Sequence, residues 1–380
     1  MILLTSEQER LLLGRPVRPL LRPSDRAAFA GQRCLVTGAG GSLGSELARQ
    51  LAACQVAQLT LLEHSEHGLF QIERELQDRW PGVSLDPVLG DVTRPGVVRQ
   101  ALGSARPHVV FHAAAYKHVG MSERAICAAA RVNVLGTALV VGAARRAGAR
   151  FMLVSSDKAA APKSVMGATK RMAELLTLAA NGAGFRTAVV RFGNVLASSG
   201  SVLTIMTERV HAGRPIPITD PNASRYFMTV SEAVSLVMKA DTLARGGETF
   251  WLDMGEPIRI GDLAERLLSI AEEVGLPRVP IEIIGLRPGE KLAEELTSQG
   301  LELRPTPHRR IRVARQPAIP VAALQSALGA LRRAVARGDA MATLDALVAA
   351  APEFVPSAEA RTRARADRPS SVSVVGAYVA

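Results

Sequence analysis

The sequence predicts an α/β protein with a doubly wound parallel sheet and a smaller C-terminal lobe. Short apolar segments alternate with helical segments of ten or more residues from about residue 33 to residue 191, which is the pattern of βαβ units. A glycine-rich segment, 38–44, directly follows the first apolar segment and leads into the first helical one. After Gly193 the alternation loosens and prolines crowd the chain, which indicates a separate lobe.

The alternating pattern predicts one domain over residues 31–193. Apolar residues that recur every three or four positions indicate helices, and short apolar runs between turn residues indicate strands. The expected strands are 34–37, 59–63, 84–90, 108–112, 151–155 and 187–191. The expected helices are 45–53, 66–79, 123–147 and 165–180.

Three segments make up the rest of the chain. Prolines interrupt residues 1–30, where we expect an N-terminal arm. Residues 194–315 are expected to form the smaller lobe, which would bind the substrate over the carboxyl ends of the strands. Residues 316–380 predict a helical appendage, with two packing helices within 320–350, and a basic tail. The expected elements of the lobe are helices at 230–243 and 260–274 and strands at 249–253 and 281–284.

The composition excludes several classes of protein. With 380 residues, 48% of them hydrophobic, the chain can form a large core and is neither disordered nor a disulfide-stapled miniprotein. Its 46 Lys and Arg exceed its 35 Asp and Glu by 11, with +3 in residues 1–34 and +6 in residues 301–380. Because the middle carries only +2 and aromatic residues are 4%, we expect no nucleic-acid partner. The arginine-rich segment 361–368 predicts a solvated tail, with peripheral contact to an anionic membrane surface left open.

The lengths of the apolar runs and the spacing of the cysteines bear on where the protein is located. No apolar run reaches the roughly 18 residues that span a bilayer, so we expect no transmembrane segment. The three cysteines, Cys34, Cys54 and Cys127, form no CxxC pair, and we expect reduced thiols in a cytoplasmic protein without a metal site.

The glycine-rich segment predicts a dinucleotide site. Gly38, Gly41 and Gly44 have the spacing that lets the backbone turn sharply and approach a pyrophosphate, and Ser42 and Leu43 begin the next helix. The first N–H groups of that helix and its dipole would face the anion. A strand before the glycines and a helix after them supply the context of a Rossmann-type domain.

Two carboxylates bear on the choice of dinucleotide. Glu63 ends the second expected strand, where it can accept hydrogen bonds from both adenosine ribose hydroxyls and repel a 2′-phosphate. Since no Arg or Lys lies in 63–68 to offset this repulsion, we expect NAD rather than NADP. For Asp91, contact with the adenine and N-capping of a helix remain equally open.

A third cluster follows the fifth expected strand. Ser156, Asp157 and Lys158 come directly after an apolar segment, at the edge where doubly wound sheets bind ligands. Packing does not readily explain three adjacent polar side chains there, and the alternative is a structural ion pair between Asp157 and a lysine. Met166 and Lys170 are four residues apart and share one face of the next helix.

With these motifs the sequence resembles the extended short-chain dehydrogenase/reductases, and within them the polysaccharide-biosynthesis 4,6-dehydratases that act on UDP-N-acetylglucosamine. The resemblance covers about residues 30–315. The matching segments are 37–47, 112–119, 133–137, 155–159, 165–171, 191–195, 225–229 and 287–291.

One position differs from the wider superfamily. Met166 stands where the superfamily has the tyrosine base of a Tyr-x-x-x-Lys pair, and a thioether cannot accept a proton from a hydroxyl. The sequence resembles in this respect one branch of the dehydratases, the large membrane-anchored enzymes that retain the C5 configuration. We expect the chain to be the catalytic domain of that branch without its membrane anchor.

The resemblance implies a reaction and the residues that catalyse it. The sugar C4 hydroxyl is oxidised by NAD, the C5 proton is removed, the C6 hydroxyl leaves as water, and hydride returns to C6. Asp157 is implied as the acid and Lys158 as the base, with Asp157 also our candidate base for the C4 hydroxyl. Ser156 would hydrogen-bond the C4 oxygen, and Lys170 the nicotinamide ribose. We expect a dry pocket to keep Asp157 protonated, and Lys170 with the nicotinamide charge to lower the pKa of Lys158.

Further residues are expected to bind cofactor or sugar. Asn133 lies within a helix, where an amide lowers helix propensity, so we expect it to face the cofactor, as we do Ala113. Lys117 and His118 follow the fourth strand and are expected to line the sugar pocket, although a surface loop is nearly as well supported.

Four positions are assigned to the nucleotide by resemblance. An arginine can pair with a diphosphate through two donors, and Glu290 could hold the uridine ribose. These positions are Asn194, Arg225, Arg287 and Glu290.

Two other functions remain open. A UDP-sugar 4-epimerase shares the C4 oxidation but needs no acid at C6 and no base at C5, so Asp157 and Lys158 would be idle. A non-catalytic NAD-binding regulator or scaffold is favoured by Met166 and disfavoured by the intact cluster 156–158. In either case we expect a UDP-sugar ligand and a homo-oligomer.

Overall fold

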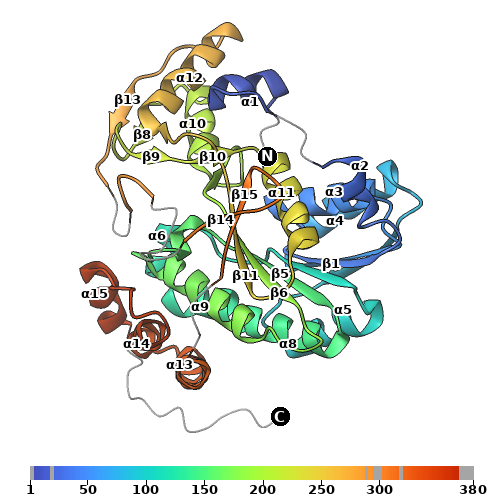
Figure 1. Cartoon of the computed structure of the whole chain (residues 1–380). Coiled ribbons are helices and arrows are strands. Elements are labelled where there is room, and N and C mark those ends of the chain that lie inside the picture. The colour runs from blue at the N-terminus through green and yellow to red at the C-terminus, as the bar shows by residue number, and fades with distance from the viewer. Residues whose placement is uncertain (1–3, 18–20, 287–289, 295–301, 316–319, 368–380) are drawn as a thin grey trace, which may run out of the picture.

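The computed structural model describes residues 4–17, 21–286, 290–294, 302–315 and 320–367 (Figure 1). Within these residues the central sheet has nine strands in the order β14-β15-β11-β6-β5-β4-β1-β2-β3. Pairing is parallel from β3 through to β11, and β15 runs antiparallel to β11. The strand order on either side of β1 is that of a doubly wound dinucleotide-binding sheet, which confirms the predicted fold class. The strands are β1 Arg33–Thr37, β2 Gln58–Glu63, β3 Ser84–Leu89, β4 Val109–His112, β5 Arg150–Val154, β6 Thr187–Arg191, β11 Glu248–Leu252, β14 Arg304–Pro305 and β15 Ile311–Arg315.

Helices cover both faces of this sheet (Figure 1). On one face α3, α4 and α11 bury a core that includes Leu47, Ile72 and Val237. On the other face α5, α8 and α9 bury Leu102 and Val140. The helices are α3 Ser42–Ala53, α4 Glu66–Arg79, α5 Pro95–Ala105, α8 Thr137–Ala147, α9 Val165–Ala179 and α11 Val230–Leu243.

The helix expected over 123–147 is divided in the structure. Helix α6 (Val119–Arg124) ends at Ala125, whose backbone leaves the helical region. Helix α7 (Ile126–Ala130) then continues into α8 through a π-helical segment, η1 (Arg131–Gly136). Single π-helical turns within α-helices are often found at functional sites. Here the π-helical segment contains Asn133.

This run, Ile126–Ala147, is long and apolar enough to cross a membrane by length and composition. A helix that meets these two criteria was not anticipated from the sequence, and the core helix of a folded domain also meets them. Its packing assigns it to the folded domain, because α8 lies on β4 and β5 and between α5 and α9, and 56% of the apolar window is buried.

The smaller lobe lies above the carboxyl ends of the parallel strands (Figure 1). Its core joins α10 and α12 to α1 of the N-terminal arm, where Leu12 and Leu13 are buried and Arg266 Nη1 donates to the Leu12 carbonyl at 2.8 Å. The arm thus docks on the lobe. The elements of the arm and lobe are α1 Ser6–Leu13, α2 Pro23–Ala27, β7 Asn194–Val195, α10 Val202–His211, β8 Ile216–Ile218, β9 Ser224–Arg225, β10 Phe227–Met228, β12 Ile258–Arg259, α12 Ile260–Glu273 and β13 Ile281–Ile283.

The range 194–315 contributes to both parts of the molecule, because α11, β11, β14 and β15 complete the central sheet and its cover. Beyond it, α13 (Val321–Arg337), α14 (Ala340–Ala350) and α15 (Ala358–Ala366) form the helical appendage (Figure 1). Their buried leucines pack on α7 and α9, so the appendage supports the helix that carries Met166 and Lys170.

Candidate functional site

The glycine loop between β1 and α3 requires glycine at two positions. Gly38 has a φ of +68°, and its N–H donates to the Leu62 carbonyl at 2.8 Å. A Cβ on Gly44 would lie 1.9 Å from the Gly38 carbonyl oxygen. Gly41 caps α3 without any side-chain hydrogen bond, so the first N–H groups of the helix remain available to a ligand.

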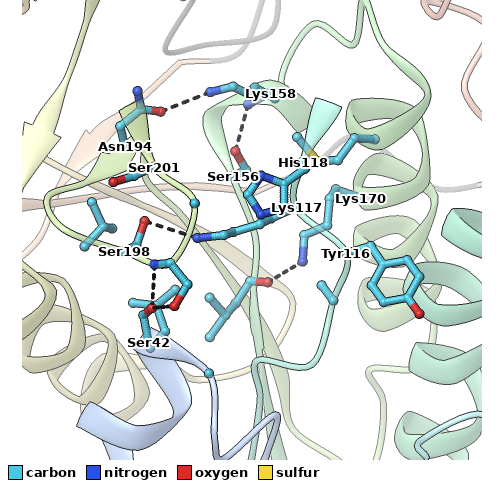
Figure 2. Close-up of a pocket in the computed structure, with 18 of the residues that line it drawn as sticks. Ser42, Tyr116, Lys117, His118, Ser156, Lys158, Lys170, Asn194, Ser198 and Ser201 are labelled. Carbon is cyan, nitrogen blue, oxygen red and sulfur yellow. Dashed lines mark hydrogen bonds between the residues drawn. The ribbon is translucent and has the colours of Figure 1, made fainter. Parts of the chain in front are cut away.

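A cavity of about 640 Å³ extends from this loop to the smaller lobe. In Figure 2, Ser42 lies at the bottom of the cavity, Lys170 at the right and Lys158 and Asn194 at the top. The structure therefore brings together most of the residues that the sequence singled out. The cavity is lined by Gly38, Gly41, Ser42, Leu43, Gly44, Ala113, Lys117, His118, Ser156, Lys158, Met166, Lys170 and Asn194, among others.

Glu63 lies beside the glycine loop, and neither Glu63 nor Asp91 lines this cavity. Both Glu63 oxygens accept from backbone N–H groups, Oε2 from Gly40 at 2.9 Å and Oε1 from Ser65 at 2.9 Å. Oε1 also accepts from the His64 N–H at 2.9 Å and lies 2.7 Å from His64 Nδ1. The carboxylate thus holds the loop, and Oε2 keeps a lone pair for a further donor. Asp91 Oδ1 accepts from the Thr93 N–H at 2.7 Å, and the N-cap of α5 is Arg94, so Asp91 is not a helix cap.

Met166 and Lys170 share the face of α9 that lines the cavity. Lys170 is 8% exposed, and its Nζ donates to the Val154 carbonyl at 2.7 Å (Figure 2). Burial lowers the pKa of Lys170 to about 8, although Glu174 opposes this shift. Lys170 can therefore still be protonated at neutral pH. The free-energy cost of burying its charge would be reduced by a hydrogen-bond acceptor nearby.

Ser156, Asp157 and Lys158 lie where β5 meets a 3-10 turn, η2 (Asp157–Ala159). Asp157 Oδ1 accepts from Ser156 Oγ at 2.8 Å and from Lys158 Nζ at 3.1 Å. Asp157 is 2% exposed, and its Oδ2 has no hydrogen-bond partner among the described residues. A carboxylate and an amine are thus in direct contact, with one carboxylate oxygen still unsatisfied.

The electrostatics of Lys158 correct one expectation. Burial acts to lower the pKa of Lys158, but the carboxylates of Asp157 and Glu294 outweigh it and the pKa is raised. Lys158 Nζ lies 3.4 Å from Glu294 Oε1 and 3.4 Å from Asn194 Oδ1. The expected lowering by Lys170 is therefore wrong for the protein without ligands, since the nearest charges are negative.

Asn133 acts behind the cavity wall. Its Oδ1 accepts from the Tyr116 N–H at 2.7 Å, and its Nδ2 donates to the Tyr116 carbonyl and to Thr169 Oγ1, both at 2.9 Å. With its side chain 1% exposed and fully bonded, Asn133 ties the loop after β4 to α9. It thus positions the loop that carries Lys117 and His118.

A buried ion pair beneath the cluster was not foreseen from the sequence. Glu174 accepts from Ser155 Oγ at 2.6 Å and from Arg191 Nε at 2.7 Å, and Glu174 and Arg191 are both fully buried. The pair fixes the end of β5 next to Ser156. A Glu four residues after Lys170 and an Arg ending a strand were the only signals of it in the sequence.

The cavity is closed on one side by a second loop, 198–201. Lys117 Nζ donates to Ser198 Oγ at 3.1 Å, and the Ser199 N–H donates to Ser42 Oγ at 3.0 Å (Figure 2). The imidazole of His118 lies against Gly200, where a Cβ would approach it to 2.6 Å. This loop therefore joins the glycine loop to the smaller lobe.

Of the four positions assigned to the nucleotide, Asn194 lines the cavity. Arg225 donates to the carbonyls of Lys291 at 2.6 Å and Leu292 at 3.0 Å, so its guanidinium holds a neighbouring segment. Glu290 is half-buried at the start of that segment. Arg287 lies outside the described residues. Within the described part of the chain no cluster of His, Cys, Asp and Glu is suited to a metal ion.

Comparison with known proteins decides the family. The family model described as polysaccharide biosynthesis protein matches residues 34–316. The capsular polysaccharide biosynthesis protein CapD of Staphylococcus aureus is 40% identical over 296 residues, which are 76% of this chain and 49% of that protein. The chain belongs to the polysaccharide biosynthesis protein family. It spans about half the length of CapD.

Two relatives with named activities are similar to this chain at equal identity. The UDP-N-acetylglucosamine 4,6-dehydratase (inverting) of Campylobacter jejuni is 31% identical over 278 residues, 71% of this chain and 78% of that protein. The UDP-glucose 4-epimerase of Rickettsia canadensis is 31% identical over 281 residues, 71% of this chain and 79% of that protein.

Solved structures of this fold include close matches. Pen from Bacillus thuringiensis has a TM-score of 0.71 and 30% identity, over 76% of this chain and 89% of that one. DesIV, a dTDP-glucose 4,6-dehydratase from Streptomyces venezuelae with NAD and TYD bound, shares the fold with a TM-score of 0.60 and 21% identity, over 70% and 88% of the two chains.

Proposed function

We propose that this chain is a NAD-dependent nucleotide-sugar 4,6-dehydratase, with UDP-N-acetylglucosamine as its substrate, in surface polysaccharide biosynthesis. The observation that carries the proposal is the 3.1 Å contact between Lys158, which lines the cavity together with Ser156, and the buried carboxylate of Asp157. An elimination of water needs both an acid and a base at adjacent carbons, and this cluster supplies both. The family and the named activity of the C. jejuni relative support the substrate class.

The residues of the glycine loop fit NAD. Gly38 and Gly44 leave no room for side chains, and the uncapped first turn of α3 offers N–H donors to a pyrophosphate. Glu63 is placed to disfavour a 2′-phosphate. When bound, NAD would accept hydride from sugar C4 and return it to C6. Lys170, in the same cavity, would hold the nicotinamide ribose.

The proton movements balance on two side chains. Asp157, as a carboxylate, takes the proton of the C4 hydroxyl while hydride leaves C4. The resulting ketone acidifies C5, and Lys158, after its ammonium group has lost a proton to solvent, removes the C5 proton as a neutral amine. Asp157 then returns its proton to the C6 oxygen, which leaves as water, and Lys158 later protonates C5. Ser156, which donates to Asp157 in the structure, would orient that carboxyl and the C4 oxygen.

Met166 supports membership in the C5-retaining branch. It is 3% exposed and lines the cavity at the position of the superfamily's tyrosine. Because its thioether cannot accept a proton, another group must take the proton of the C4 hydroxyl. Asp157 is the carboxylate of the cluster 156–158 and can do so. Return of the proton by Lys158, from the side on which it was removed, retains C5.

The rival reading is a UDP-sugar 4-epimerase, and the R. canadensis relative favours it. An epimerase passes hydride to and from C4 alone and gives Asp157 and Lys158 no substrate proton at C5 or C6. The two readings predict different products from the same substrate.

The test is incubation of purified protein with UDP-N-acetylglucosamine and NAD, followed by mass spectrometry of the nucleotide sugar. We expect loss of one water from the sugar, abolished in Asp157→Asn and Lys158→Met variants that still bind NAD. An isomer of unchanged mass would show an epimerase. Binding of NAD without turnover of any UDP-sugar would favour the regulator or scaffold.

A further inference from the structure

A short segment, residues 290–294, crosses from the smaller lobe to the Asp157–Lys158 turn, and we call it the strap. Arg225 donates to two of its carbonyls, and the Ser224 N–H donates to the Leu292 carbonyl at 2.7 Å. On the opposite side, Lys291 Nζ donates to the Ala161 carbonyl, just beyond η2, at 3.1 Å. The strap is therefore bonded both to the lobe and to the dinucleotide-binding domain.

The strap carries a carboxylate that contacts the proposed base. The Glu294 side chain is 6% exposed, and its Oε1 lies 3.4 Å from Lys158 Nζ and 3.7 Å from Arg225 Nε. A carboxylate so withdrawn from water is stable only with charged partners, and it has one from each part of the molecule. Neither composition nor motif spacing singled out Glu294, because its role depends on where the strap lies.

We propose that Glu294 is a positioning residue for the base of the proposed dehydratase: its carboxylate holds Lys158 Nζ beside Asn194 and controls how readily the amine becomes neutral. The inference rests on the proposed function for its kinetic consequence. It goes beyond that function because it assigns control of the base to the lobe rather than to the catalytic turn.

The charges around Lys158 give the direction of the effect. Asp157 faces it from its own turn, Glu294 and Arg225 face it from the lobe, and α9, packed against the turn, brings Lys170. Burial and Arg225 favour the neutral amine, whereas the two carboxylates favour the ammonium ion and raise the pKa. Once Asp157 has taken the C4 proton, Glu294 is the remaining carboxylate in contact with Lys158. Removal of its charge should then lower the pKa of the base.

The first test is the pH dependence of kcat in Glu294→Gln. Activity rises with pH as Lys158 becomes neutral, so a lower pKa moves this acid limb to lower pH, by about one unit for an opposite charge at this distance. Glu294→Asp keeps the charge, so its acid limb should lie close to that of the wild type. Glu282→Gln removes an exposed carboxylate from β13 of the same lobe and should leave the limb in place.

The second test needs no turnover. Trace acetylation with acetic anhydride over a pH series, read by mass spectrometry of the Lys158 peptide, reports the ionisation of this amine in the whole folded chain. In Glu294→Gln the midpoint should fall by about one unit relative to wild type and Glu282→Gln. Melting curves of each variant establish that it is folded, and Glu294→Ala, which also removes the carboxylate, serves in the acetylation series if Glu294→Gln does not fold.

The outcomes separate the inference from the proposed function. A lowered midpoint with a shifted acid limb supports both. A lowered midpoint in a chain that turns over no UDP-sugar supports the contact and overturns the dehydratase. An unchanged midpoint, or an unchanged acid limb in an active enzyme, overturns the role of Glu294.

Discussion

Replacing Gly44 by alanine tests the geometry of the dinucleotide loop. The new Cβ would lie 1.9 Å from the Gly38 carbonyl oxygen, 2.6 Å from its carbon and 2.9 Å from Ala39 Cα. Contacts of a Cβ below 3.0 Å are essentially never seen, so loop and helix must separate by at least 1.1 Å. All three obstacles are backbone atoms, and the Gly38 N–H is held by Leu62, so no side chain can move aside.

This displacement should be costly. Overpacking a rigid site costs about 3 kcal/mol. With an unfolding entropy of about 2.1 cal/mol/K per residue, a chain of 380 residues loses roughly 1.3 °C of Tm per kcal/mol, so we expect a loss of about 4 °C. Since the loop moves away from the pyrophosphate position, NAD affinity should fall by more than about tenfold.

The assay is thermal melting of the ligand-free protein, with NAD titration calorimetry. The matched control is Gly41→Ala, whose Cβ would meet the same carbonyl oxygen at 3.2 Å and should cost less than about 1 kcal/mol in stability. If Gly44→Ala melted with the control and bound NAD as wild type does, the close approach of helix and loop would be refuted.

Three further predictions concern stability. Burial lowers the pKa of His112 to about 3, so below about pH 6.5 the unfolded chain binds a proton that the folded chain does not. The free energy of unfolding should therefore drop by about 2 kcal/mol between pH 6.5 and pH 5. A His112→Gln variant should lack this drop in urea titrations. Arg191→Met removes the buried partner of Glu174 and leaves that carboxylate to the longer contact with Arg171, at 3.5 Å, so it should cost about 3 kcal/mol. Adding Glu174→Gln should recover part of the loss, and equal losses in the single and double variants would contradict the pair. Leu331→Ala truncates a fully buried side chain of α13 in the appendage and should cost about 3 kcal/mol in the main unfolding transition, and no change in that transition would mean that the appendage folds separately.

The fold was accessible from the sequence because its signals are local. Strands that are buried on both faces appear in the sequence as short apolar runs. The helices between them keep apolar residues at every third or fourth position, whatever they pack against. The boundary at residue 193 was less accessible, because β11 returns to pair with β6 and only chain topology shows this. The break at Ala125 and the docking of α1 on α12 likewise depend on partners far away in sequence.

The candidate site was accessible where residues are adjacent in the chain. The glycine loop and 156–158 bring their chemistry together by covalent proximity, and the structure places glycine-loop residues, Ser156 and Lys158 around one cavity. Asn133 was identified as a polar residue out of place in a helix, and its partners in the structure are the backbone of Tyr116 and the hydroxyl of Thr169. Glu174 and Glu294 were missed because a carboxylate on an amphipathic helix or in a loop is usually solvated, and only folding buries it against Arg191 or Lys158.

The central claim is that Asp157 carries the C4 hydroxyl proton to the C6 oxygen, while Lys158 removes and returns the C5 proton. It is tested most directly by proton NMR of UDP-N-acetylglucosamine incubated with the protein and NAD in D₂O. The account predicts a new C6 methyl signal, a C4 ketone, and C5 retained in configuration with deuterium wherever Lys158 exchanges with solvent. A galacto-configured product with its C6 hydroxyl intact would contradict it.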